Sequence, residues 1–397
     1  GRNYFGNLDK GEKVDAQTVR FVTQAPDPTL DQRLASYTAF IVCNEALEAF
    51  QKDDQDAQVW MDAAANALQW NPVGTGPYKF AGYEKDNFVK LEAFADSWQG
   101  APEAASLTFR AVPEVAARVA GLVAGDYDMS VDIPSDQWDI VRNYDNLVLK
   151  TIPIENSHVL VFNTSDPVLS DKNLRHAMSL SIDRKALIDA LWKGQTYTPN
   201  GPQIPTFGPL YDESREGYDY DIEAAQAALE DSSYSGEEIS YRLIPNYYTY
   251  NVEVAQIIQE MWRAIGINTR IDFVDSFKEV RADGAQVYAW SNTYRIPDPV
   301  GAFLPLYGPG ADIQDEHKFF VPPQEFNDLA VELRSSTDVE KRRADFGKML
   351  DIFMDEMPIT ILYNPVLAYA MKDTIDWQPF AQFYMDFGPE NLSLNGQ

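Results

Sequence analysis

The sequence is poor in the residues that cross-link chains or bind metals. Among its 397 residues it has one cysteine, Cys43, and three histidines, His158, His176 and His317. One cysteine cannot form a disulfide within the chain, and this set cannot supply a closed structural zinc site. A fold held together by internal disulfides or by such a zinc site is therefore excluded.

Positive charge is also scarce. The chain has 32 lysine and arginine residues against 61 aspartate and glutamate residues, a formal net charge of −29 at pH 7. A field of this sign repels nucleic-acid phosphates and anionic lipid headgroups, so we expect no nucleic-acid partner and no adhesion to a membrane surface. Hydrophobic residues make up 45% of the chain and aromatic residues 13%. This content is too apolar for a disordered acidic chain and predicts a globular protein.

Long hydrophobic runs are absent. The longest apolar segments, such as Ala39–Cys43 and Ile359–Tyr363, are strand-sized, whereas a membrane span needs ~18 residues. We therefore expect no direct insertion into a membrane. The start of the chain, Gly1 to Gly6, has neither an initiator methionine nor a basic and then apolar signal segment, which we interpret as a mature form or a fragment.

The hydrophobic periodicity that is present predicts an α/β protein. A strand at 239–244, a helix at 251–265 and a strand at 268–274 form a strand–helix–strand unit, and residues 107–131 show the same order. Both units favour a parallel sheet. Residues 325–354 carry one long helical pattern.

Motifs for catalysis and for nucleotide binding are missing. No Gly-x-Ser-x-Gly elbow and no glycine-rich phosphate loop occurs, and His158 and His176 lack a flanking catalytic signature. Pairs of acidic residues are frequent in a chain of this charge, so they do not single out a glycosidase site. We predict no catalytic residue, no cofactor and no metal, and hence no enzyme.

Two aromatic and polar segments directly follow predicted strands. Open α/β sheets bind ligands at the carboxyl ends of their strands. Amide, hydroxyl, guanidinium and aromatic groups together can hydrogen-bond a polar solute and stack on its flat faces. The predicted ligand-binding residues are Trp290, Asn292, Thr293, Tyr294, Arg295, Asn246, Tyr247 and Tyr248. The alternative is that Trp290 and Tyr248 pack in a core or at a hinge.

Several ordered motifs resemble one family. Residues 71–78 read Asn-Pro-Val-Gly-Thr-Gly-Pro-Tyr, residues 118–128 contain Arg-x-x-x-Leu-x-x-Gly-Asp-x-Asp, and Phe-Asn-Thr at 162–164 precedes Leu-Arg-His-Ala-Met at 174–178. These segments resemble the family-five extracellular solute-binding proteins, the dipeptide-, oligopeptide- and nickel-binding type of ABC importers. The similarity extends from Asp15 to Leu394.

The resemblance implies an α/β, two-lobed periplasmic-binding-protein fold, or Venus flytrap, with an extra small domain. Family members usually begin earlier, so the N-terminal part is expected to be missing. We expect residues 1–70 to be the remainder of the small domain, 71–158 lobe I, 159–366 lobe II and 367–397 the return to lobe I. The expected crossings lie near 157–163 and 363–371, with Phe162, Asn163 and Leu367 as hinge residues.

The resemblance also bears on the ligand. Peptide-binding members carry an aspartate at the position of Thr293, where it pairs with the α-ammonium group of the peptide. Burying an ammonium group without a counter-charge costs several kcal/mol. Thr293 thus weakens the peptide interpretation, while Arg295 suits a carboxylate and the neighbouring hydroxyl and amide groups suit hydroxyls. An oligosaccharide or a sugar-acid or opine-like conjugate is favoured, with a di- or oligopeptide as the alternative.

The expected function is that of an extracytoplasmic solute-binding subunit of an ABC importer. It would bind its solute between the two lobes and deliver it to the membrane-embedded permease subunits. The expected location is periplasmic, or extracellular and membrane-associated, and the expected state is a monomer. The alternative from another class is a secreted hydrolase, which turnover of candidate oligomers would reveal.

Overall fold

The computed structural model describes residues 5–36, 39–52, 56–382 and 384–395. The chain divides into two compact units. Unit 1 comprises residues 1–39 and 153–366, and unit 2 comprises residues 40–152 and 367–397. Residues 1–39 thus fall in unit 1 and residues 40–70 in unit 2, while we expect residues 1–70 to be the remainder of the small domain. The expected domain partition otherwise stays a prediction.

Unit 1 is built on a five-stranded sheet with the order β10-β9-β11-β8-β12. Its strands are β8 (Asn156–Phe162), β9 (Ile239–Leu243), β10 (Thr269–Phe273), β11 (Val287–Thr293) and β12 (Ile359–Tyr363). β9 pairs in parallel with both β10 and β11, whereas β8 runs antiparallel to β11 and β12. The carboxyl ends of β9, β10, β11 and β12 therefore lie at the same edge of the sheet as the start of β8.

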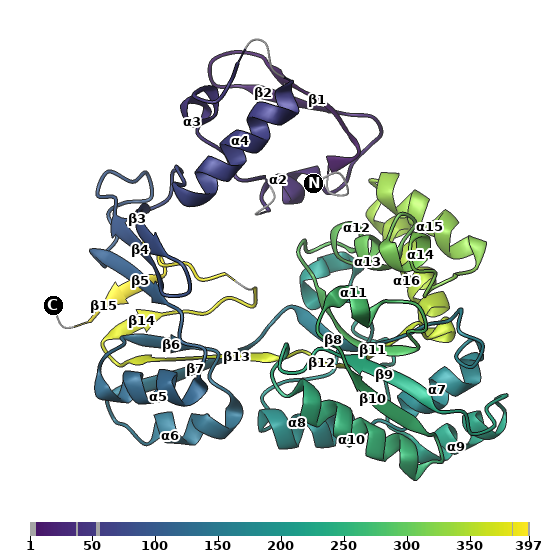
Figure 1. The fold of residues 1–397 in the computed structure, drawn as a ribbon. Coiled ribbons are helices and arrows are strands. Elements are labelled where there is room, and N and C mark those ends of the chain that lie inside the picture. Colours follow the sequence, from purple (N-terminus) through teal and green to yellow (C-terminus); the bar gives the residue numbers. More distant parts are fainter. Residues whose placement is uncertain (1–4, 37–38, 53–55, 383, 396–397) are drawn as a thin grey trace. The chain divides into compact units, whose positions relative to one another are not determined.

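Helices cover both faces of this sheet (Figure 1). One face carries α7 (Lys172–Leu180), α8 (Arg184–Trp192), α9 (Ile222–Glu230) and α10 (Asn251–Ala264). The indole of Trp262 on α10 donates a hydrogen bond to the carbonyl of Met178 on α7 at 2.8 Å and joins two of these helices. All seven residues of β8 are buried, as expected for a strand covered on both sides.

The other face carries an aromatic core. Its helices are α11 (Phe277–Val280), α12 (Pro299–Ala302), α13 (Leu304–Tyr307), α14 (Asp312–Asp315), α15 (Gln324–Ser335) and α16 (Val339–Glu356). Ring centroids of Phe303 and Tyr307 lie 5.1 and 4.6 Å from that of Phe353. The single long helix expected at 325–354 is wrong, because the chain breaks at residues 336–338, where Asp338 caps the start of α16 through the backbone N–H of Lys341.

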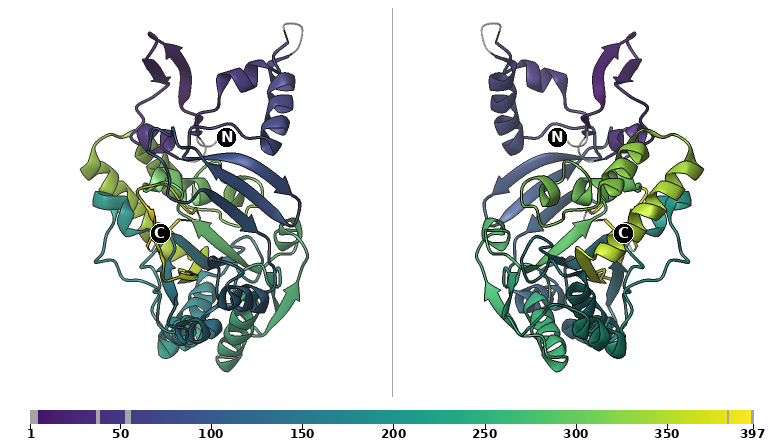
Figure 2. Two further views of the ribbon diagram at one scale, coloured as in Figure 1. Left: turned by 90° about the vertical axis from the view of Figure 1, so that its left-hand side faces the viewer. Right: turned by 90° about the vertical axis from the view of Figure 1, so that its right-hand side faces the viewer.

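The rest of unit 1 consists of short elements. These are β1 (Leu8–Lys13), β2 (Val19–Thr23), α2 (Leu30–Leu34) and the 3₁₀ segment η3 (Pro205–Leu210). β1 and β2 form their own antiparallel pair, which is visible as two arrows at the start of the chain in Figure 2.

The described part of unit 2 contains three small sheets. The helical elements are α3 (Asn44–Glu48), α4 (Ala57–Trp70), α5 (Val115–Ala124), η2 (Ser135–Gln137) and α6 (Trp138–Arg142). The strands are β3 (Tyr78–Glu84), β4 (Phe88–Ala93), β5 (Ser106–Arg110), β6 (Met129–Val131), β7 (Leu147–Pro153), β13 (Val366–Lys372), β14 (Ile375–Trp377) and β15 (Leu392–Leu394). Tyr369, Met371, Trp377 and Leu392 form a buried cluster that joins β13, β14 and β15.

The parallel unit expected at 107–131 is wrong. β5 belongs to the antiparallel sheet β3-β4-β5, while β6 belongs to the sheet β6-β13-β7 and pairs antiparallel with β13. The helix between them, α5, forms as predicted and ends at Gly125. The partner of β6 lies more than 200 residues further along the chain, so local periodicity cannot reveal it.

Candidate functional site at the strand ends of unit 1

Four uncharged polar side chains meet where β8 begins and β11 ends. In the register of the two strands Asn156 faces Thr293 and His158 faces Ser291. Residues two apart on a strand share a face, so all four lie on one face of the sheet. The amide Nδ2 of Asn156 donates to Oγ1 of Thr293 at 2.9 Å. Asn156 is 3% exposed, and its Oδ1 has no hydrogen-bond donor among the described residues.

Two tyrosine rings enclose His158. The ring of Tyr248 lies 4.6 Å from the imidazole, and the ring of Tyr363 lies 5.5 Å from it. The Tyr248 hydroxyl donates to Oγ of Ser291 at 3.2 Å. Burial lowers the pKa of His158 to about 3 and raises the pKa of Tyr248 to about 12, because both charged forms lose their hydration there. Both side chains are therefore uncharged at neutral pH.

The loop after β9 is held in a constrained conformation. Asn246 and Tyr250 have positive φ angles of 60° and 63°, which non-glycine residues adopt at an energetic cost. The buried side chain of Asn251 spans this loop. Its Oδ1 accepts from the backbone N–H of Asn246 at 3.1 Å, and its Nδ2 donates to the carbonyl of Ile244 at 2.6 Å. Tyr247, which is 54% exposed, is presented by this fixed loop.

Of the residues predicted from the sequence, Trp290 and Asn292 lie on the opposite face from Thr293. The ring of Trp290 packs 5.2 Å from that of Phe277, with the guanidinium of Arg281 4.8 Å above it. The amide of Asn292 is 1% exposed and donates to the hydroxyl of Tyr307 on α13. These contacts favour a packing role for both side chains.

The remaining predicted residues fall into two environments. Tyr294 is buried, with its hydroxyl 3.2 Å from Oγ of Ser157, and Arg295 is exposed just beyond β11. Asn246 is exposed in the loop after β9, next to Tyr247. Tyr248 thus contacts Ser291, which lies on the same face of β11 as Thr293. Tyr294, in contrast, lies in the protein interior.

The predicted hinge residues are placed as follows. Phe162 is buried at the end of β8, and Asn163 follows it, with Nδ2 donating to the carbonyl of Ala285 at 2.8 Å. Both lie within unit 1, about ten residues after the boundary at 152/153, whereas Leu367 lies directly at the second boundary. Their hinge role stays a prediction.

Sequence reasoning missed Asn156, Ser291 and Asn251 and considered His158 only as a catalytic residue. The alternation of Ser291 and Thr293 with Trp290 and Asn292 is a readable signal, because it separates two faces of one strand. The pairing of Asn156 with Thr293 joins positions 137 residues apart and has no local signal.

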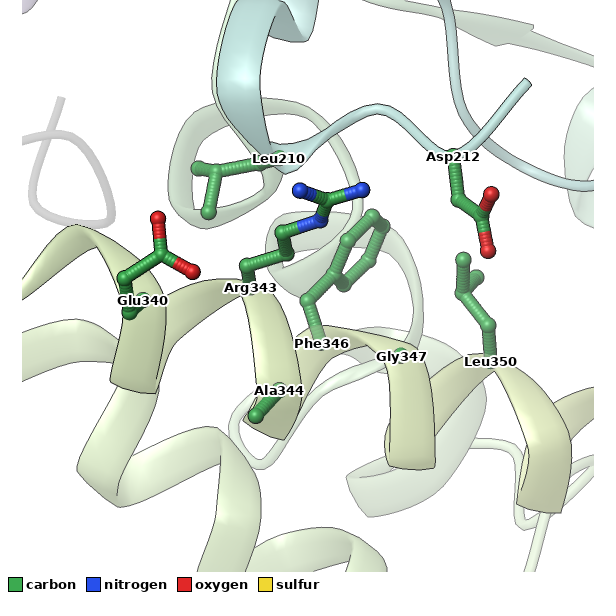
Figure 3. A pocket seen from close by; sticks show the side chains of 8 residues that line it. All are labelled: Leu210, Asp212, Glu340, Arg343, Ala344, Phe346, Gly347 and Leu350. Atoms are coloured by element: carbon green, nitrogen blue, oxygen red, sulfur yellow. The ribbon is translucent and has the colours of Figure 1, made fainter. Parts of the chain in front are cut away.

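Among the described residues, two of the cavities lie elsewhere in unit 1. The first, of about 350 Å³, lies between η3 and α16. Figure 3 shows Leu210 and Asp212 on one side of it and Arg343, Phe346 and Leu350 of α16 on the other. The second, of about 460 Å³, lies between the N-terminal segment and the helices α12 to α15. Neither cavity is lined by a ligand-binding residue predicted from the sequence.

The described part of the chain has neither a metal-binding cluster nor a membrane-spanning helix. No group of three or more histidine, cysteine, aspartate or glutamate side chains is placed to hold a metal ion there. Within the same residues, no helix is both long enough and apolar enough to cross a membrane.

Comparison with known proteins shows one family. The model of the bacterial extracellular solute-binding proteins, family 5 Middle, matches residues 1–314. The glutathione-binding protein GsiB of Salmonella choleraesuis (strain SC-B67) is 26% identical over 369 residues, which are 90% of this chain and 68% of the relative.

Solved structures share the fold. DppA of Helicobacter pylori, an ABC transporter-associated periplasmic binding protein in complex with the peptide STSA, matches with a TM-score of 0.81 and 18% identity, over 100% of this chain and 77% of its own. AgaA from A. tumefacien R10, in complex with agropinic acid, matches with a TM-score of 0.78 and 22% identity, over 100% and 79%. The predicted fold class, two-lobed and α/β, is confirmed. The chain belongs to the bacterial extracellular solute-binding proteins of family 5.

Proposed function

We propose that the protein is the extracytoplasmic solute-binding subunit of an ABC importer and performs no chemistry on its solute. Its partners are the membrane-embedded permease subunits, and it acts in the periplasm or at the outer face of the membrane, as a monomer. Membership of the solute-binding family supports this role.

The solute that we propose is polar, with an oligosaccharide or a sugar-acid or opine-like conjugate as the favoured class. The observation that carries this choice is the uncharged character of Asn156, His158, Ser291 and Thr293, which share one face at the strand ends. An ammonium group bound there would have no counter-charge within the set and would lose several kcal/mol of hydration. Arg295 lies exposed just beyond Thr293, and a guanidinium group is chemically suited to a carboxylate. The complex of AgaA with agropinic acid supports the same class.

A di- or oligopeptide is the second candidate. GsiB is named for glutathione, and the DppA structure holds the peptide STSA. A peptide would need an acidic side chain other than Thr293 to hold its ammonium group.

A hydrolase receives no support from the geometry. The imidazole of His158 is packed against tyrosine rings, and that of His176 contacts the backbone carbonyl of Asp355 at 2.8 Å. Neither contact provides the serine and aspartate partners that nucleophilic catalysis uses.

The proposed function can be tested with a thermal-shift panel of oligosaccharides, agropinic acid, dipeptides and glutathione. Mass spectrometry of the recovered solutes should accompany it. We expect stabilisation by a hydroxyl-rich or carboxylate-bearing solute, retained intact at one molecule per protein. Stabilisation by free-amine peptides alone would favour the second candidate, and cleavage of any solute would overturn the binding role.

A further inference from the structure

The hydroxyl groups of Ser291 and Thr293 are both engaged as acceptors by the protein itself. Oγ1 of Thr293 accepts from Nδ2 of Asn156 at 2.9 Å, and Oγ of Ser291 accepts from the hydroxyl of Tyr248 at 3.2 Å. A hydroxyl group has one proton to donate. Because each oxygen already receives a proton from a neighbour, each proton is left to point to another acceptor.

The direction of these two hydrogen bonds has a physical basis. The phenol of Tyr248 is more acidic than the aliphatic hydroxyl of Ser291 and is therefore the better donor. Nδ2 of Asn156 is the atom that lies 2.9 Å from Oγ1 of Thr293, and an amide N–H can only donate.

Ser291 and Thr293 are also the accessible members of the group. Both are partly exposed, whereas Asn156 and His158 beneath them are 3% and 8% exposed. They are two residues apart on β11 and on one face, so their hydroxyl groups are about 7 Å apart along the strand. Glu155, which directly precedes Asn156, is the carboxylate nearest to this group in sequence. It accepts from the hydroxyl of Thr206 at 2.9 Å.

We propose that Ser291 and Thr293 form a pair of oriented donors that binds oxygen acceptors of the solute and disfavours its ammonium groups. The acceptors are carboxylate, carbonyl or hydroxyl oxygens about 7 Å apart along one molecule. An ammonium group has only donors, so the two O–H protons offer it nothing and each hydroxyl oxygen keeps only its second lone pair to accept from it. Asn156 and Tyr248 are positioning residues, because they act through the two hydroxyl groups. This inference rests on the proposed function and deepens it by assigning the chemistry of one subsite.

The test compares acceptor-bearing probes with a donor-bearing one. The acceptor probes are agropinic acid, cellobiose, glucuronic acid and N-acetyl-Ala-Ala, and the donor probe is free Ala-Ala. Calorimetry with the whole chain gives the affinity of each probe for the wild type. We expect N-acetyl-Ala-Ala to bind more tightly than Ala-Ala. Differences among agropinic acid, glucuronic acid and cellobiose show whether the acceptor is a carboxylate or a neutral oxygen.

Four variants then test the mechanism on the acceptor probe that binds the wild type most tightly. Thr293→Val and Ser291→Ala each remove one donor and should weaken binding about three- to tenfold, the effect of one hydrogen bond. Tyr248→Phe should weaken binding by releasing the Ser291 hydroxyl. Asn156→Asp replaces the donor to Thr293 with an acceptor, which turns the Thr293 proton inward. It should weaken acceptor probes and strengthen Ala-Ala.

Two matched controls are needed. One shows the effect on affinity of adding a negative charge away from the site, and the other shows the effect of losing a tyrosine hydroxyl away from the site. Asn173→Asp on α7 adds the same charge elsewhere in unit 1, and Tyr144→Phe removes a partly exposed hydroxyl in unit 2. Both should leave affinities unchanged. If an acceptor probe binds but Thr293→Val, Ser291→Ala and Tyr248→Phe retain wild-type affinity, the donor pair is overturned while the proposed function stands. If no probe binds the wild type, the proposed function and the inference that depends on it both fail.

Discussion

The guanidinium of Arg342 donates through Nη2 to both carboxylate oxygens of Asp298, at 2.7 and 2.8 Å. Both side chains are buried, at 5% and 3% exposure. Asp298 also caps α12 by accepting from the backbone N–H of Val300 at 2.8 Å. The pair therefore connects the segment after β11 to α16. It thereby supports the position of the end of β11, which carries Ser291 and Thr293.

Breaking this ion pair should be costly. Asp298→Asn leaves the charge of Arg342 buried without a counter-charge, so we expect the free energy of unfolding to fall by about 3–5 kcal/mol. Urea denaturation measures the change. The matched control is Asp189→Asn, which removes the exposed Lys185–Asp189 pair of α8 and should leave the free energy of unfolding nearly unchanged, because solvent screens an exposed pair. Equal effects of the two substitutions would contradict a structural role for the buried pair.

Asn251 should control the loop that carries Tyr247 and Tyr248. Asn251→Ala removes two part-buried hydrogen bonds across the loop, so we expect a loss of about 1–3 kcal/mol of stability. Solute affinity should fall as well, because the two positive-φ residues relax once the loop is released. Urea denaturation and calorimetry measure both effects. Asn268→Ala, an exposed position after α10, is the control, and unchanged stability in Asn251→Ala would refute the role.

Trp290→Ala should act mainly on stability. From the sequence, stacking on the solute predicts weaker binding with little change in the melting temperature of the free protein. The contacts of the ring with Phe277 and Arg281 instead predict that the free energy of unfolding falls by about 3–5 kcal/mol. Because the ring is only partly buried, we expect a value at the lower end of this range. Denaturation of the free protein decides between the two. A normal unfolding midpoint combined with weaker solute binding would restore the stacking role.

The sequence allows local features to be predicted and leaves distant pairings open. The strand–helix–strand order of β9, α10 and β10 and the parallel pairing of its strands follow from local periodicity. The region of the site could also be predicted, because loops after parallel strands meet at one edge. Which side chains share a face depends on the register of β8 against β11, and this register is set by contacts more than 100 residues apart. The alternation of side chains along β11 separates Trp290 from Thr293 without that register, whereas the pairing of Asn156 with Thr293 depends on it.

The buried imidazole of His158 should make stability depend on pH in a defined window. Burial lowers its pKa in the folded protein to about 3, whereas a histidine in an unfolded chain titrates near 6.5. Between these values the unfolded state binds a proton that the folded state does not, so the free energy of unfolding rises with pH through this window and is lost as the pH falls. The contribution is up to about 1.4 kcal/mol per pH unit and vanishes above about pH 7.

His158→Gln removes this contribution to the pH dependence of stability. Denaturant unfolding of wild type and variant from pH 4.5 to 8.5 should give curves that are parallel above pH 7 and converge below pH 6, as the wild type loses stability faster. If the difference between the two curves is constant from pH 4.5 to 8.5, His158 is protonated equally in the folded and unfolded states, and its placement between Tyr248 and Tyr363 as a neutral ring is wrong.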